Sequence, residues 1–321
     1  MKKIKNIFKH CQCKNATAKI VSRTIKSNSD HIFIRSVKKI VFVLILLITF
    51  SCRKDVKLNF PDYKQKVVVE ASIETGGPAI VLLSWSVPYF GSFDFNTPEN
   101  AFIKGAFVTI SDGSVTDTLK ELDPTKGYVY VGFKLFGQQG KTYNLNVTVN
   151  GKTFTSASTI LAPPKLDSLY FKGEKDSLGF IWQRFSEPKG LGDNYRWFAK
   201  RLTKDQFYAA PFGSAFDDKF IDGKTFDFAY DRGPQPNKIQ EYRDDPEQGY
   251  FKRKDTVVVK FCKIGKAEYD FWNTYYENKS SNSNPFSAPS NIKSTFGYNQ
   301  DVFGAFVAYS PFFDTLIIPK K

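Results

Sequence analysis

Short runs of β-branched and aromatic residues, separated by turn residues, recur along the chain from about residue 65 onward. Residues 66–74 (KVVVEASIE) and 79–87 (AIVLLSWSV) are two such runs, and Gly76, Gly77 and Pro78 join them. Runs of this kind are typical of strands, and a short glycine-containing connection is typical of a hairpin. The sequence therefore predicts two antiparallel strands over these ranges.

The clearest alternation covers residues 141–159, KTYNLNVTVNGKTFTSAST. Leu145, Val147 and Val149 alternate with polar residues up to Asn150-Gly151, a pair that favours the positive φ angles of a type I′ hairpin turn. Several short strands bounded by turn signals within roughly a hundred residues are typical of an immunoglobulin-like fold. We therefore expect an immunoglobulin-like β-sandwich over residues 65–162.

A proline-containing stretch at residues 161–169 (LAPPKLDSL) interrupts the alternation and predicts a domain boundary. Beyond it, the runs SLYFKG, LGFIWQRF, YRWFAKRL, DTVVVKFCKI and VFGAFVAYS are typical of strands. A helical period occurs over residues 265–279, where Tyr269, Trp272, Tyr275 and Tyr276 share one face. That face indicates packing on a sheet, with sugar binding as the alternative. We predict an all-β protein whose second β-rich domain, residues 163–321, contains this helix.

An apolar run from Ile40 to Phe50 follows two lysines and ends at Ser51-Cys52. Its eleven residues are too few to span a bilayer as a helix, which needs about twenty. The pattern resembles a bacterial lipoprotein signal, in which the cysteine thiol is acylated and the chain is cut just before it. We expect residues 1–51 to be leader and signal peptide, with translation starting near Arg35. We further expect Cys52 to be lipidated and residues 52–64 to form a tether.

The net charge of +14 suggests nucleic acid at first sight. Residues 1–51, however, hold 11 basic residues and one acidic residue. The rest of the chain therefore has 46 − 11 = 35 basic and 32 − 1 = 31 acidic residues, a balance of +4. An excess this small is ordinary for a soluble surface, so no nucleic-acid partner is expected.

Both histidines, His10 and His31, lie in the leader. The remaining chain therefore lacks the Ser-His-Asp and Cys-His sets of hydrolases and any His-ligated metal site. Cys262 is the one cysteine left as a thiol, and its strand-like surroundings predict a buried, unreactive side chain. We expect a protein that is not an enzyme and holds no cofactor.

Two weaker chemical alternatives rest on carboxylates in FDDKFIDG, residues 216–223. Asp217, Asp218 and Asp222 are spaced closely enough to offer oxygen ligands to calcium, or to cap a solvated turn. Asp217 or Asp218, together with Glu187 or Asp193, is the carboxylate set of the alternative function, a glycan-active surface hydrolase.

Two loops rich in aromatic residues, SVPYFGSFDF and FYAAPFGSAFDD, are candidates for a binding surface. Tyr89, Phe90, Phe207 and Phe212 are the expected partner-binding anchors, because exposed aromatic side chains bury a large area with few rotatable bonds. The alternative is that these rings fold back into the core.

An ordered set of stretches resembles the domain of unknown function 4249 (DUF4249) family of Bacteroidota outer-membrane lipoproteins. They include VVVEASIETGGPAIVLLSWSVPYF, IKGAFVTISDG, GKTYNLNVTVNGKTFTSASTI and VFGAFVAYS, and they extend from about residue 65 to 310. The resemblance implies an accessory or substrate-capture partner of a TonB-dependent receptor. Such a protein would be lipid-anchored in the outer membrane and face the periplasm or the cell surface. A structural or adhesive surface lipoprotein is the other alternative.

Overall fold

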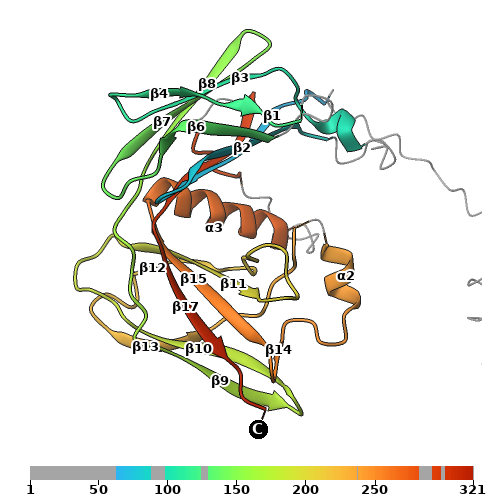
Figure 1. The fold of residues 1–321 in the computed structure, drawn as a ribbon, viewed down its shortest axis with the longest axis vertical. Helices are drawn as coiled ribbons and strands as arrows, with labels where there is room; N and C mark the ends of the chain where they lie inside the picture. The colour runs from blue at the N-terminus through green and yellow to red at the C-terminus, as the bar shows by residue number, and fades with distance from the viewer. Residues whose placement is uncertain are drawn as a thin grey trace, which may run out of the picture. The chain divides into compact units, whose positions relative to one another are not determined.

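The computed structural model describes residues 63–87, 98–123, 129–236, 238–281, 291–297 and 301–320. Figure 1 shows a mainly β architecture, and the all-β prediction is confirmed. The elements of the first half are β1 (Val67–Glu74), β2 (Pro78–Trp85), η1 (Pro98–Ala101), β3 (Phe107–Ser111), β4 (Thr116–Thr118), β5 (Lys120–Glu121), β6 (Val129–Phe136), β7 (Thr142–Val149) and β8 (Lys152–Thr159). Those of the second half are β9 (Ser168–Lys175), β10 (Leu178–Ser186), β11 (Asn194–Arg201), β12 (Ala215–Asp217), β13 (Thr225–Ala229), α2 (Ile239–Asp244), β14 (Phe251–Lys252), β15 (Thr256–Ile264), α3 (Lys266–Ser281), β16 (Val302–Tyr309) and β17 (Pro311–Ile317).

A sheet with strand order β16-β1-β2-β6-β5 and a sheet with order β4-β3-β7-β8 enclose the first core. The predicted hairpins are confirmed: β1 pairs antiparallel with β2, and β7 with β8. Asn150 and Gly151 have φ angles of 50° and 75°, as a type I′ turn requires. Alternating inward side chains from both sheets form the core, which is the packing of a β-sandwich.

β16 belongs to this first sandwich although it lies near the carboxyl end of the chain. It pairs in parallel with β1, from Val67 opposite Val302 to Glu74 opposite Tyr309. At Gly304 (φ 140°) a Cβ atom would stand 1.8 Å from the carbonyl oxygen of Val69, so only glycine fits. The division of the chain at residue 162 stays a prediction, and β16 is the strand that crosses it.

The second sandwich consists of a sheet with order β13-β10-β14, in which β9 also pairs with β10, and a sheet with order β12-β11-β15-β17. Its core is largely aromatic. Phe185, Tyr195, Trp197 and Phe261 are buried there, and the rings of Phe185 and Phe261 lie 5.2 Å apart in an edge contact. Cys262, in β15, is buried as expected, and burial raises the pKa of its thiol to about 12.

The predicted helix is confirmed as α3, which lies against β16, β12 and β11 (Figure 1). The aromatic face expected to be buried is only partly so: Tyr269, Trp272, Tyr275 and Tyr276 are half-buried, while Phe271 is the buried ring. The helix packs on β16 on one side and on β11 and β12 on the other, so burial is spread around it. No helix among the described residues is long and apolar enough to cross a membrane.

Candidate functional site

The connection between β11 and β12, residues 202–214, carries two of the expected anchors. Phe207 and Phe212 are each 51% exposed, so neither ring folds into a core. Phe212 lies against α3, with its ring 4.9 Å from that of Tyr276. Tyr89 and Phe90 lie outside the described residues. Of the two alternatives that the sequence left open for Phe207 and Phe212, the structure has the exposed one.

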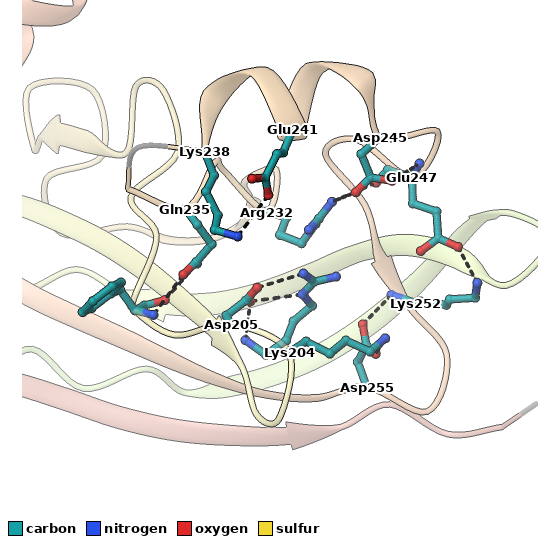
Figure 2. Close-up of polar contacts among 12 residues, drawn as sticks. Lys204, Asp205, Arg232, Gln235, Lys238, Glu241, Asp245, Glu247, Lys252 and Asp255 are labelled. Atoms are coloured by element: carbon teal, nitrogen blue, oxygen red, sulfur yellow. Dashed lines mark hydrogen bonds and ion pairs between the residues drawn. The ribbon is translucent and has the colours of Figure 1, made fainter. Parts of the chain in front are cut away.

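Two ion pairs fix the beginning of this connection (Figure 2). The backbone nitrogen and Nε of Arg201 donate to Asp205 Oδ2 at 2.8 Å and 3.0 Å, and its NH2 group donates to Oδ1 at 2.8 Å. Lys204 Nζ donates to Asp255 Oδ1 at 2.5 Å. Both acceptor residues are buried, so each carboxylate has its charge balanced by a neighbour within the fold.

Gln235 holds the backbone of Phe207 in place. The Gln235 side chain accepts a hydrogen bond from the backbone nitrogen of Phe207 and donates one to its carbonyl oxygen, both at 2.9 Å (Figure 2). This two-fold contact imitates the pairing of a neighbouring strand. Ala209, two residues on, exchanges backbone hydrogen bonds with Ala199 in β11. The backbone of Phe207 is therefore held while its ring faces solvent.

A second set of ion pairs lies around the segment that carries Gln235. The NH2 group of Arg232 donates to Asp245 Oδ2 at 2.6 Å, and Lys252 pairs with Glu247. The backbone nitrogen of Lys252 also donates to Asp255 Oδ2, which connects this row to the first (Figure 2). Each of these charged side chains is therefore paired with a side chain of opposite charge.

Exposed apolar side chains occur on β17 as well as on this connection. Phe313 and Ile317, on one face of β17, are 49% and 72% exposed. The ring of Tyr208 lies 5.8 Å from that of Phe313. Leu202 is 41% exposed, and its backbone nitrogen donates to Thr256, the residue that pairs with Ile317. We define the exposed apolar surface as Leu202, Phe207, Phe212, Phe313 and Ile317.

Sequence reasoning found two members of this surface and missed three. Phe313 and Ile317 each follow another apolar residue in the last strand, Phe312 and Leu316, so the pattern does not say which face is covered. Leu202 lies at the end of a strand, where no periodicity applies. Gln235 offered no sequence signal, because its contacts are to a backbone about thirty residues away.

The acidic residues around Asp218 accept hydrogen bonds from backbone nitrogens. Asp218 Oδ2 accepts hydrogen bonds from the backbone nitrogens of Gly192 and Asp193 at 2.7 Å and 2.8 Å, and Asp222 Oδ1 accepts one from Gly190 at 2.5 Å. Burial and the nearby Asp217 carboxylate raise the pKa of Tyr269 to about 12. Within the described ranges, no three His, Cys, Asp or Glu side chains are grouped to hold a metal ion.

The carboxylates of the hydrolase alternative lie together but bind protein groups. The hydroxyl of Tyr195 lies 3.1 Å from Glu187 Oε1 and 3.2 Å from Asp193 Oδ2. Glu187 Oε2 accepts a hydrogen bond from the backbone nitrogen of Gly223, and Asp193 pairs with Lys263 at 2.5 Å. Burial raises the pKa of the Tyr195 hydroxyl further above its ordinary value. Through these contacts the cluster joins the end of β10 to β11 and β15.

The family described as "Domain of unknown function (DUF4249)" matches residues 53–312. No curated protein matches the chain. Among solved structures, a two fibronectin type-III domain segment from chicken tenascin is similar, with 13% sequence identity and a TM-score of 0.20. The similarity covers 63% of this chain and 92% of that one. Because the family match covers most of its length, this chain belongs to the DUF4249 family.

Proposed function

We propose that this DUF4249 protein is a non-enzymatic, lipid-anchored outer-membrane protein that binds a TonB-dependent receptor through its exposed apolar surface. The observation that supports it is the exposure of Phe207 and Phe212 on a connection whose backbone is fixed by Gln235 and by buried ion pairs. Aromatic side chains on a pre-organised backbone are typical of binding hot spots, because little conformational freedom is lost on association.

The membrane part of the proposal rests on the sequence around Cys52. An acylated Cys52 would place the chain at a membrane, and the expected tether, residues 52–64, would link the lipid to the folded part. Labelling with a fatty-acid probe tests this step: the wild-type chain should be labelled and Cys52→Ala should not. A labelled Cys52→Ala chain would remove the anchor from the proposal.

Crosslinking in intact cells, followed by purification through a carboxyl-terminal tag, tests the partner. We expect recovery of a TonB-dependent barrel and an interface on the order of 1,600 Å² or more. Phe207→Glu and Phe212→Glu should each reduce recovery about tenfold or more, since a central aromatic anchor contributes about 2 kcal/mol. Phe133→Glu is the matched control, because Phe133 is 54% exposed on β6, outside the surface.

Other outcomes separate the alternatives. Recovery of no barrel, with the lipoprotein alone at the cell surface, would favour a structural or adhesive protein. Turnover of a surface glycan that disappears in Asp218→Asn would favour the hydrolase. Either result would overturn the proposal.

A further inference from the structure

One face of the sheet formed by β9, β10 and β13 carries aromatic rings that belong to no core. Ile181 and Phe185 of β10 point into the aromatic core, so the alternate residues Phe180, Trp182 and Arg184 lie on the opposite face. Tyr170 of β9 stands directly opposite Trp182, and Ala229 of β13 stands opposite Trp182 on its other side. Two rings therefore lie side by side on neighbouring strands, with a single methyl group next to the indole.

The Trp182 side chain has an unpaired N–H group and a lysine ammonium group near its ring. Its Nε1 is inaccessible to solvent but has no hydrogen-bond partner, although a buried indole N–H usually has one. The Nζ of Lys172 lies 3.7 Å from the centroid of the indole ring and 5.5 Å from that of Tyr170. Lys172 is exposed on a flexible stem, so its contact with the two rings can give way to a ligand.

A fixed pair of polar groups borders the rings. Arg184 Nε and NH2 donate to Asp227 Oδ1 and Oδ2 at 2.9 Å and 3.0 Å, a fork that holds both side chains in one plane. The hydrogen bonds from Arg184 keep the pKa of Asp227 below its ordinary value, so its carboxylate stays ionised. The guanidinium retains further N–H donors and the carboxylate further acceptor positions, and the side chains of Arg184 and Asp227 are 55% and 29% exposed.

These features fit a sugar ring better than other ligands. A pyranose has an apolar face of C–H groups, which packs on an aromatic ring, and a rim of hydroxyl groups, which both donate and accept hydrogen bonds. An anionic ligand is disfavoured because the charge of Arg184 is balanced by Asp227. A protein partner would be expected to use strongly exposed apolar side chains, whereas Tyr170, Phe180 and Trp182 are only partly exposed.

We propose that the Tyr170–Trp182 face binds a neutral saccharide chain, with sugar rings stacked on the two aromatic side chains and hydroxyl groups bonded to Arg184 and Asp227. This site is on a different sheet from the exposed apolar surface and does not depend on the receptor partnership. The indole N–H of Trp182, which has no hydrogen-bond partner, is a further donor in the same side chain.

Affinity electrophoresis of the full chain, in native gels containing one soluble polysaccharide each, tests the site. The panel is hydroxyethyl cellulose, xyloglucan, galactomannan, glycogen and a soluble β-1,3-glucan, and titration calorimetry with the matching hexasaccharide gives the affinity. We expect at least one polysaccharide to retard the wild-type chain. Trp182→Ala and Tyr170→Ala should each weaken binding about tenfold, the effect of losing one stacked ring.

Phe133→Ala, which removes an exposed ring from another sheet, is the matched control and should bind like the wild-type chain. If Trp182→Ala fails to fold, Arg184→Gln decides, because its side chain is 55% exposed and its loss leaves both cores intact. Wild-type binding by a folded Trp182→Ala or Arg184→Gln chain would overturn the proposal, and so would the absence of retardation by every polysaccharide in the panel.

Discussion

The two sandwiches of this protein have cores of different chemistry. The first is built mainly from aliphatic side chains, such as Val81, Leu83, Ile110 and Leu145, which alternate regularly along their strands. The second is a cluster of rings around Phe261, whose centroid lies 5.5 Å from Tyr195 and 6.1 Å from Phe216. Aliphatic chains fill space without directional demands, whereas rings impose preferred angles and leave polar edges to be satisfied.

Buried polar groups follow the same division. Among the described residues, only three of sixteen buried polar or charged side chains precede residue 162, namely Asp117, Ser156 and Ser158. The others lie in the aromatic half or at its junction with α3. Both candidate binding surfaces lie in this half as well. The aliphatic half therefore mainly encloses a core, while the aromatic half is rich in fixed polar contacts around exposed side chains.

The largest expected effect comes from truncating a buried side chain of the aromatic core. Phe261→Ala should lower the free energy of unfolding by about 4 kcal/mol, because it removes a fully buried ring and leaves a cavity. Leu145→Ala, the matched change in the aliphatic core, should cost about 3 kcal/mol. Urea denaturation followed by circular dichroism measures both. Because β16 belongs to the first sheet and packs on α3, we expect one common transition; two transitions, with only one shifted, would contradict the coupling.

A smaller effect is expected at the junction of the two halves. The Arg196 guanidinium lies 3.3 Å from the Trp272 ring, and its NH1 group donates to the hydroxyl of Tyr309 at 2.7 Å. Arg196→Met should lower the free energy of unfolding by about 2 kcal/mol, since it leaves the buried Tyr309 hydroxyl without its donor.

Arg184→Gln is the control for this change, because Arg184 is an exposed arginine whose ion pair is screened by solvent. It should alter unfolding little. Equal losses in the two variants, measured by the same urea titration, would show that the Arg196 contacts are not specific to the junction.

A third difference concerns pH. Glu268 of α3 accepts a hydrogen bond from Ser158 of β8 at 2.5 Å, and burial raises the pKa of its carboxyl above the ordinary 4.5. The folded protein therefore holds this proton at pH values where the unfolded chain has lost it. Its stabilising contribution is complete below pH 4.5 and is lost as the pH rises through the folded-state pKa.

Glu268→Gln removes this dependence. The stability that the variant gains over the wild-type chain should be larger at pH 7.5 than at pH 4. Urea midpoints of both chains at the two pH values measure this difference. Ser158→Ala leaves the carboxyl in place but removes its hydrogen-bond donor, together with the acceptor of the Ala308 backbone N–H, so its loss of stability should not depend on pH in the same way. A Glu268→Gln gain that does not change with pH would show that Glu268 is not protonated in the folded state.

In the aliphatic half, the sequence predicted the local pairings but not the distant ones, for a physical reason. The β1–β2 hairpin and the Asn150-Gly151 turn depend on neighbours in sequence, so alternation and turn chemistry reveal them. The parallel pairing of β1 with β16 joins residues more than two hundred positions apart, which no local pattern can show. Asp117 is equally hidden: its Oδ2 accepts hydrogen bonds from the backbone nitrogens of Phe133, Lys134 and Leu135.

The candidate sites show the same limit. Composition indicated aromatic side chains available for binding, but Gln235 holds the backbone that leaves Phe207 exposed. The pattern of α3 predicted a single buried face, whereas Glu268 is also buried because the helix has neighbours on both sides. Periodicity locates the side chains of one element, and it cannot supply the elements that come to rest against it.

The smallest expected effect is at the exposed apolar surface. Phe207→Ser should change the free energy of unfolding by no more than about 0.5 kcal/mol, because the ring is 51% exposed and Gln235 bonds only its backbone. Phe198→Ser is the matched change in the same half: that ring is 9% exposed and lies 4.7 Å from Arg196, so its loss should cost about 3 kcal/mol. Urea denaturation of both chains measures the contrast. A large loss in Phe207→Ser would mean that the ring supports the fold, and the exposed apolar surface would then lose its first anchor.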